Sequence, residues 1–341
     1  MSYLILFLLI SFSASSDDAD DAEVVKNTQL DTILDNKIEE YRGIYPDITF
    51  LVLKGGKGLV ADMMTLDIHL GHEPVSLDYE HPPELRNDLM QVSANRILQM
   101  LQYGIPSAAL FKADEPLEWQ DTICVLTINP SIVASDTTQA TESLLGMSHE
   151  FVTSIPDELR ITPTDYLKYI IDHEVYHCLQ SKYIGPQPMS MKELWGDYWH
   201  HLSELGADSY SLGMHIKEKG KITTFVTNVN RIRGTALSTS DPNHLTCRAI
   251  EHIINTPDEQ IAEMSTKEVF ALAGEIKSKL TMSYDEYLQF MASAVEAMRE
   301  LGVDTLLGED AAVIIDAIEP DPTRVKVMIE RTRLCLTELG G

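Results

Sequence analysis

The spacing of apolar residues predicts a mixed first part of the chain and a helical second part. Alternating apolar residues predict a strand over 48–53, and a β-branched, apolar run predicts another over 122–128. Helical spacing predicts helices over about 30–41 and 82–103, and beyond Pro163 over 163–183, 192–219, 244–254, 267–280, 284–301, 309–318 and 323–339. We therefore expect an α+β, mostly helical fold, with an α/β part at 28–160 and a helical part at 161–341.

The N-terminus begins with an apolar run. Residues 3–12 are almost entirely apolar, and the small residues 13–16 follow them. This run has the length of a signal-peptide core and is too short to span a bilayer as a helix. We predict a signal peptide at 1–15, a disordered acidic lead-in at 16–27, and export to the periplasm or outside the cell. No Lys or Arg precedes the run, which leaves an uncleaved apolar end as the alternative.

Composition narrows the classes of function. The 341 residues are 44% hydrophobic and carry a formal net charge of -27. Such an acidic surface repels phosphate backbones, so nucleic-acid binding is disfavoured. The negative net charge either keeps the protein soluble or favours the binding of basic substrates. After the first run no segment is apolar for long enough to cross a membrane, so we expect no stable membrane insertion of the mature chain.

Four cysteines are present, and none forms a CxxC pair. In an exported protein they can pair as disulfides in three ways, or they can be small buried hydrophobes. The pairing stays open among Cys124, Cys178, Cys247 and Cys335.

The chemistry concentrates in the segment HEVYH, from His173 to His177. Thr162 as N-cap and Pro163 at the first helical position predict that this segment lies on a helix. Residues four apart share one helical face, so both imidazoles can reach a single Zn²⁺. Glu174, one residue on, lies beside the metal and can act as general base. Uncharged residues surround the pair, namely Ile170, Ile171, Val175, Tyr176, Cys178 and Leu179. They predict a buried helix whose polar groups need a partner.

A catalytic zinc site needs a third protein ligand. Glu204 and Asp208 lie four residues apart on the next predicted helix and share one face. Glu204 could bind zinc while Asp208 fixes the tautomer of a ligand histidine. His200 and His201 are competing third ligands, and an all-histidine site is the alternative.

HExxH followed by ExxxD on a second helix resembles the gluzincin metallopeptidases, the thermolysin-like clan. The segment ELGADSYSLG also resembles the ExxAD segment of CAAX-type periplasmic and membrane zinc peptidases. The resemblance covers about 37 residues, and 26 residues separate His177 from Glu204, more than in thermolysin and fewer than is usual in the CAAX-type group. Gln180 and Tyr183 exclude the metzincin pattern HExxHxxGxxH. The resemblance implies a zincin-like core in which Glu204 is the third ligand and Asp208 the partner of His173.

Two further assignments complete the expected site. Gluzincins commonly stabilise the oxyanion with a downstream His or Tyr, which implies this role for His244, with His252 and Tyr210 as weaker candidates. The strand at 122–128 precedes the metal helix, as the substrate-aligning edge strand does in zincins. A peptide could pair with its free edge, or the strand could be a buried structural one.

We therefore expect a zinc-dependent peptidase that binds one Zn²⁺ per chain and acts on a peptide or protein substrate. Glu174 moves the proton, and His173, His177 and Glu204 hold the metal. Two alternatives remain. One is a catalytically inactive periplasmic binding or assembly protein with a zincin fold, and the other is a zinc amidase acting on a non-peptide amide.

Overall fold

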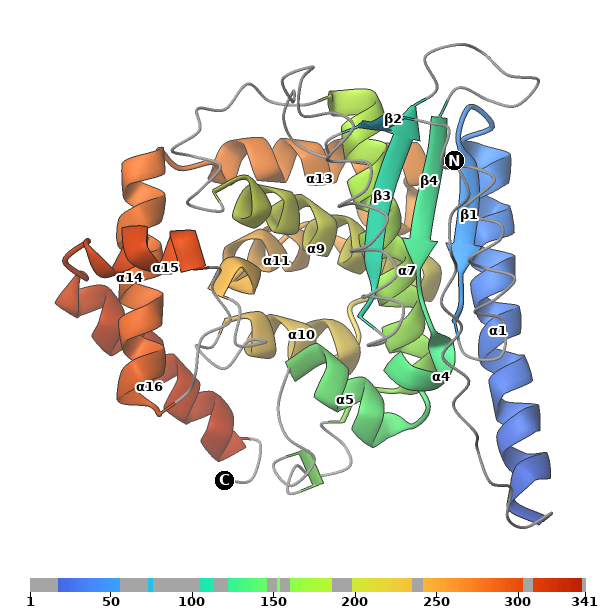
Figure 1. The fold of residues 1–341 in the computed structure, drawn as a ribbon, viewed down its shortest axis with the longest axis horizontal. Coiled ribbons are helices and arrows are strands. Elements are labelled where there is room, and N and C mark those ends of the chain that lie inside the picture. The colour runs from blue at the N-terminus through green and yellow to red at the C-terminus, as the bar shows by residue number, and fades with distance from the viewer. Residues whose placement is uncertain are drawn as a thin grey trace, which may run out of the picture.

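The fold was obtained as a computed structural model, which describes residues 18–55, 73–75, 105–112, 122–145, 152–153, 160–185, 198–234, 242–302 and 309–338. The predicted signal peptide at 1–15 and the predicted helix at 82–103 lie outside these residues. Within them the protein is α+β and mostly helical, as its sequence predicts (Figure 1).

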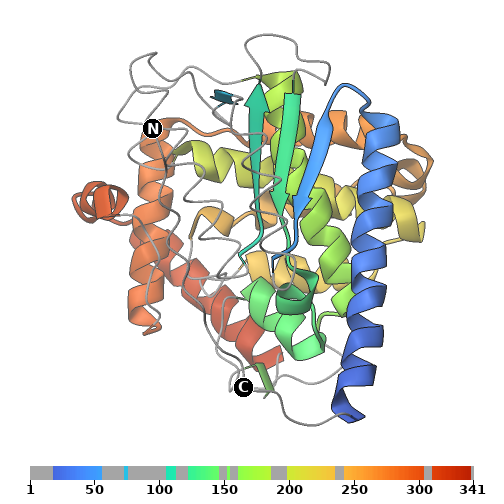
Figure 2. The same ribbon diagram turned by 45° about the vertical axis from the view of Figure 1, so that its right-hand side comes forward.

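A four-stranded sheet precedes most of the helices in the chain. Its strands are β1 (Thr49–Leu53), β2 (Glu73–Val75), β3 (Ser107–Lys112) and β4 (Thr122–Thr127), in the order β1-β4-β3-β2. β1 runs parallel to β4, whereas β3 is antiparallel to both β4 and β2. In the two ribbon views the sheet stands between α1 and the body of the helices (Figures 1 and 2).

β4 is an inner strand of this sheet. β1 pairs with it along one edge and β3 along the other, and all six of its residues are buried. A strand covered on both faces has a continuous apolar sequence, which explains the run TICVLT. The prediction that a substrate peptide pairs with a free edge of this strand is therefore wrong.

Most of the remaining described residues are helical. None of the described helices is long and apolar enough to cross a membrane. They are α1 (Asp18–Ile44), α4 (Pro130–Val133), α5 (Thr137–Leu145), α7 (Pro163–Leu179) with a π-helical turn (Gln180–Ile184), α9 (Tyr198–Lys219), α10 (Thr224–Arg233), a 3₁₀ turn (Pro242–His244), α11 (Cys247–Ile254), α12 (Asp258–Glu263), α13 (Thr266–Leu280), α14 (Tyr284–Glu300), α15 (Glu309–Asp316) and α16 (Pro322–Glu338).

The acidic lead-in predicted at 16–27 is not disordered from Asp18 onward, because α1 begins there. Acidic side chains at a helix N-terminus interact favourably with the helix dipole, so this composition suits a first turn. Further along α1, the side chains of Leu30, Leu34, Ile38 and Tyr41 recur on one face and are all buried. Their packing accounts for the helix expected at 30–41, and α1 extends beyond that range at both ends.

α7 begins where the sequence predicts. Pro163 is its first residue, and the Thr162 side chain accepts a hydrogen bond from the backbone N–H of Asp165. α7 packs against β3 and β4 on one side, α1 on another and α9 on a third. It is therefore buried around most of its circumference, and from Tyr169 to Tyr176 every residue is buried.

One hydrophobic core joins the sheet to the helices. It contains Leu126 of β4, Ile171 of α7, Tyr210 of α9 and Tyr287 of α14. The core continues across the predicted boundary between residues 160 and 161, so the helices that carry the chemistry are held directly against the sheet.

Candidate metal centre

α7 and α9 cross at a close contact that requires a glycine. A Cβ built on Gly206 would lie 2.1 Å from the hydroxyl oxygen of Tyr176, whose ring is fully buried. Only a residue without a side chain leaves room on α9 for the end of the Tyr176 ring, which projects from α7. The approach brings Glu204 of α9 opposite the two histidines of α7.

His173, His177 and Glu204 converge as the sequence predicts. His173 Nε2 lies 3.0 Å from Glu204 Oε2, and His177 Nε2 lies 3.4 Å from Glu204 Oε1. The ligand atoms of the three side chains all lie within 4.8 Å of one another, and all three residues are buried. This group could hold a metal ion.

The donor set fits a metal better than it fits a hydrogen-bonded cluster. Glu204 Oε2 is buried and makes no hydrogen bond to any described residue, although His173 Nε2 lies 3.0 Å away. A buried carboxylate oxygen that accepts no hydrogen bond is costly, and a cation removes the cost. Two imidazoles and one carboxylate are also the ligand set of many catalytic zinc sites.

Asp208 lies beside the far nitrogen of His173, as predicted. Its Oδ1 is 3.0 Å from His173 Nδ1, and the carboxylate is fully buried. Tyr169 and Thr246 donate hydrogen bonds to it, and Arg233 Nε lies 3.3 Å from Oδ2. These contacts hold Asp208 in place, so it can fix the orientation of the His173 ring.

Sequence reasoning missed two residues of the centre. Ser203 Oγ lies 2.8 Å from Nδ1 of His177. It can therefore fix the orientation of the His177 ring, as Asp208 can fix that of His173. Arg233 of α10 is buried and offsets the charge of Asp208. No spacing rule connects Arg233 to the centre. The available signals were a serine immediately before the ligand Glu204 and an arginine at the end of an amphipathic helix.

The charged groups of the centre shift one another's pKa. Burial alone lowers the pKa of His173, but attraction to Glu204 outweighs it and raises the value to about 10. Burial alone raises the pKa of Glu204, but the charges of His244 and His173 hold it well below its usual value. For Glu174 burial prevails, so its pKa is raised. A carboxylate with a raised pKa is a stronger base, which suits the role predicted for Glu174.

The remaining sequence candidates separate into those near Glu204 and those away from it. His200 Nε2 lies 3.3 Å from Glu204 Oε1, and His244 Nε2 lies 3.1 Å from Oε2. The His201 ring instead has its Nδ1 2.9 Å from the backbone oxygen of Asn243, so it contacts the turn that carries His244.

Of the two weaker oxyanion candidates, His252 belongs to neither group of converging ligand atoms. Tyr210 is buried and donates a hydrogen bond to the hydroxyl of Tyr41. His252 is exposed on α11. The sequence predicts that His244 begins a helix, and this is wrong. His244 ends the 3₁₀ turn, and α11 begins at Cys247.

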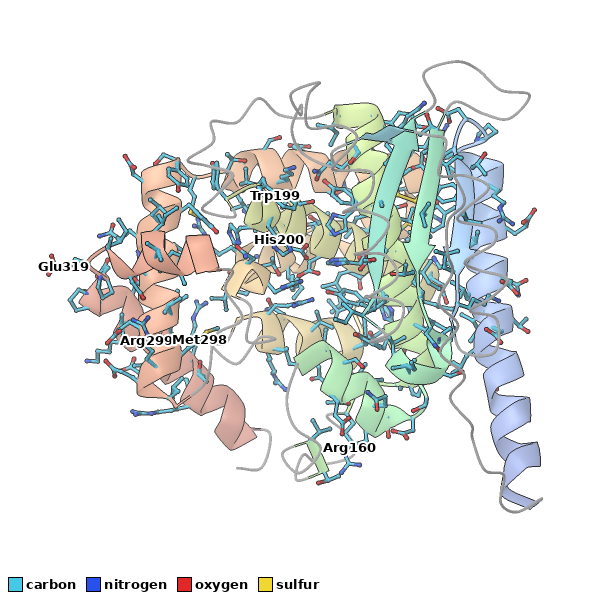
Figure 3. All side chains as sticks on the ribbon, in the orientation of Figure 1. Arg160, Trp199, His200, Met298, Arg299 and Glu319 are labelled. Atoms are coloured by element: carbon cyan, nitrogen blue, oxygen red, sulfur yellow. A yellow bond between two sulfur atoms is a disulfide. The ribbon has the colours of Figure 1, made fainter. Side chains whose placement is uncertain are left out.

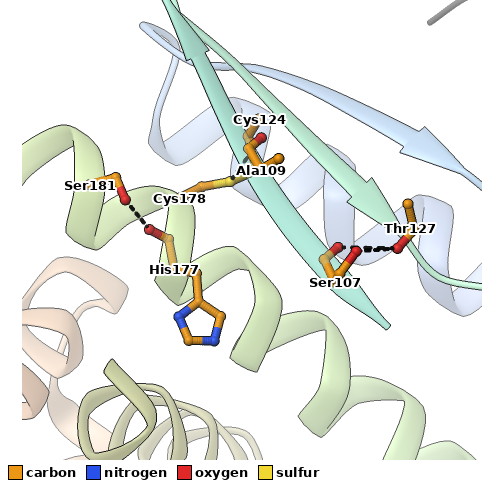
Figure 4. The surroundings of a disulfide bond; sticks show 7 residues. All are labelled: Ser107, Ala109, Cys124, Thr127, His177, Cys178 and Ser181. Carbon is orange, nitrogen blue, oxygen red and sulfur yellow. Dashed lines mark hydrogen bonds between the residues drawn. A yellow bond between two sulfur atoms is a disulfide. The ribbon is translucent and has the colours of Figure 1, made fainter. Parts of the chain in front are cut away.

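A disulfide joins Cys124 of β4 to Cys178 of α7, next to His177 (Figure 4). Cys178 Sγ also lies 3.9 Å from the backbone oxygen of Ala109 in β3. Cys247 is a free, half-buried thiol. The disulfide fixes α7 to the sheet next to His177, one of the candidate ligands.

A buried ion pair holds the other side of α7. Lys37 of α1 lies 3.0 Å from Asp172, the residue before His173, and Tyr41 donates a hydrogen bond to the same carboxylate. Attraction to Asp172 outweighs the effect of burial and raises the pKa of Lys37, whereas burial raises the pKa of Asp172. α1 therefore supports the metal helix directly behind the first histidine.

The chain matches no family model, and neither the curated proteins nor the solved structures include a match to it. Its function has to be argued from the site.

Proposed function

We propose that the protein is a zinc-dependent peptidase that uses Glu174 as general base. The observation that carries the proposal is the convergence of His173, His177 and Glu204 in a buried site, with Glu174 next to the first histidine along α7. Two imidazoles and a carboxylate suit zinc, and three protein ligands leave a fourth position for water or substrate.

The residues of the chain have separate tasks in this reaction. His173, His177 and Glu204 would hold a zinc ion, which when bound would supply Lewis-acid chemistry to the attacking water and the scissile carbonyl. Glu174 accepts a proton from the attacking water and passes it to the leaving amine. Asp208 and Ser203 hold the imidazoles of His173 and His177 with Nε2 directed at the centre.

A substrate peptide has to align with an edge other than that of β4. β2 pairs with residues 110–112 of β3, and the section from Ser107 to Ala109 has no second partner strand among the described residues. Ala109 lies against Cys178, which follows the ligand His177. We place the extended peptide along this section of β3, where backbone hydrogen bonds can bind it.

Export is part of the proposal. The Cys124–Cys178 disulfide supports it, because disulfides persist in oxidising compartments such as the periplasm or the extracellular space. The apolar run at the N-terminus is the second support.

The deciding experiment compares the mature wild-type chain with Glu174→Gln and Glu204→Ala. Metal content is measured by mass spectrometry, and turnover of denatured casein is followed with and without a chelator. We expect Glu174→Gln to keep its metal and to lose activity by on the order of 10²–10⁴-fold, because only the proton transfer is removed.

Glu204→Ala is expected to lose both metal and activity. Full turnover by Glu174→Gln would refute the mechanism. A wild-type chain that holds zinc but cleaves neither casein nor a peptide library would favour the inactive binding protein or the amidase.

A further inference from the structure

Four histidines, and not two, surround Glu204. Each carboxylate oxygen lies between one histidine of HEVYH and one histidine from elsewhere. Oε2 is 3.0 Å from His173 Nε2 and 3.1 Å from His244 Nε2. Oε1 is 3.4 Å from His177 Nε2 and 3.3 Å from His200 Nε2. The carboxylate is therefore within reach of the HEVYH histidines and of the other two histidines at the same time.

These distances have the size of ligand separations around one small cation. In a tetrahedral zinc site with bonds of 2.0–2.1 Å, two ligand atoms lie roughly 3.4 Å apart. The atoms of His200, Glu204 and His244 lie within 4.8 Å of one another, as do those of His173, His177 and Glu204. Only Glu204 belongs to both groups. The five side chains thus form two groups of three, not one crowded site.

The position of His200 follows from the helix that carries it. His200 lies four residues before Glu204 on α9, so the two side chains project from the same face. Its ring stacks on that of Trp199, with centroids 5.4 Å apart, and the two residues lie next to each other on α9 (Figure 3).

The position of His244 is fixed by contacts of its neighbour Asn243. The backbone oxygen of Asn243 accepts a hydrogen bond from His201 of α9, at 2.9 Å. Its side-chain oxygen accepts one from the hydroxyl of Tyr287 of α14, also at 2.9 Å. Asn243 is buried. The turn is therefore anchored from two helices, and the reach of His244 toward Glu204 does not depend on a loose loop.

The second group is closer to solvent than the first. The side chains of His200 and His244 are 30% and 20% exposed, against 5% and 11% for His173 and His177. Glu204 Oε2, which faces His244, is buried and has no hydrogen-bond partner among the described residues. A carboxylate shared between two cations would give this oxygen the partner that it lacks among the described hydrogen bonds.

We propose that His200, His244 and Glu204 hold a second divalent metal ion, with Glu204 bridging it to the first. The inference rests on the proposed metal centre, and it assigns His244 to metal binding in place of the oxyanion role that the family resemblance implies. Two ions bridged in this way lie about 3.5–4 Å apart, as in two-metal hydrolases. The outer ion is the weaker and more exchangeable one because its ligands are more exposed.

The test is a metal titration of the chelator-stripped mature chain with Zn²⁺, followed by native mass spectrometry. We expect about two ions per wild-type chain, in two affinity classes. His200→Ala and His244→Ala should each bind about one ion, because the second group then keeps only two ligands. His252→Ala is the matched control, since His252 is exposed on α11 outside both groups, and it should still bind both ions.

A second readout needs no variant. The wild-type chain loaded with Co²⁺ should give an electron paramagnetic resonance signal that weakens when the second equivalent is added, because bridged ions couple magnetically. Circular dichroism of every variant checks that it is folded.

The outcomes separate this proposal from the proposed function. One ion in the wild type that His200→Ala and His244→Ala both retain would overturn the second site and leave the peptidase centre standing. If His244→Ala bound both ions yet lost turnover, the second site would again be wrong and the oxyanion role would be supported. No ion in the wild type would overturn both proposals.

Discussion

At the scale of single residues, the orientation of a ligand depends on the group behind it. His177 can present Nε2 to a metal only if its other nitrogen keeps the proton, and Ser203 Oγ lies 2.8 Å from that nitrogen to accept it. His173 has the stronger partner Asp208, which is charged and held by Arg233. The two histidines are thus oriented by different chemistry.

Ser203→Ala tests this role. Without an acceptor at Nδ1, the His177 ring loses its fixed tautomer, so zinc affinity should fall by on the order of 10-fold. Competition with a chromophoric chelator measures the change. Ser209→Ala is the control, because Ser209 is equally buried on α9 but hydrogen-bonds only to the carbonyl of Leu205 in its own helix. Equal losses of affinity in the two variants would show that Ser203 has no special role.

At the scale of elements, the site depends on how closely two helices approach. α7 carries the histidines and α9 carries Glu204, so the contact at Gly206 sets the distance between ligands. The same helix has a second close contact, because a Cβ on Gly213 would lie 2.8 Å from Val269 of α13. α9 is therefore positioned by glycines on both sides.

Gly206→Ala should push α9 away from α7. A methyl group at this position collides with the buried Tyr176 ring, and we expect a loss of about 1–3 kcal/mol in the free energy of unfolding. Urea denaturation measures the loss, and weaker zinc binding should accompany it. Gly274 lies within α13, and in Gly274→Ala the new methyl meets Ile184 at an ordinary contact distance of 3.7 Å, so that variant should gain about 0.5–1 kcal/mol. A Gly206→Ala protein as stable as Gly274→Ala would contradict the packing described.

At the scale of the whole molecule, the sheet supports the metal helix. The disulfide ties β4 to α7 beside His177, and the Lys37–Asp172 pair ties α1 to α7 beside His173. The C-terminal helices contribute as well, since Tyr287 of α14 anchors the turn that carries His244. Segments from the whole described chain thus position one small site.

Removing the disulfide should weaken this arrangement. The bond closes a loop between residues 54 positions apart, so the double variant Cys124→Ala/Cys178→Ala should lose about 2–4 kcal/mol in the free energy of unfolding. Chemical denaturation under oxidising conditions measures it. Cys247→Ala removes a thiol that forms no disulfide and serves as the control. If a reducing agent destabilised the double variant as much as the wild type, the stabilisation would not come from this bond.

What the sequence determined about this protein is local. The N-cap Thr162, the shared face of His173 and His177, and the shared face of Glu204 and Asp208 follow from helical periodicity over a few residues, and the structure has all of them. Which side chains meet across the chain was decided only by tertiary packing. The inner position of β4, the Cys124–Cys178 pairing, the contact of Arg233 with Asp208 and the reach of His244 toward Glu204 join segments that periodicity does not relate. Their partners depend on where the core places each element, because packing of buried surfaces, and not local spacing, fixes those distances.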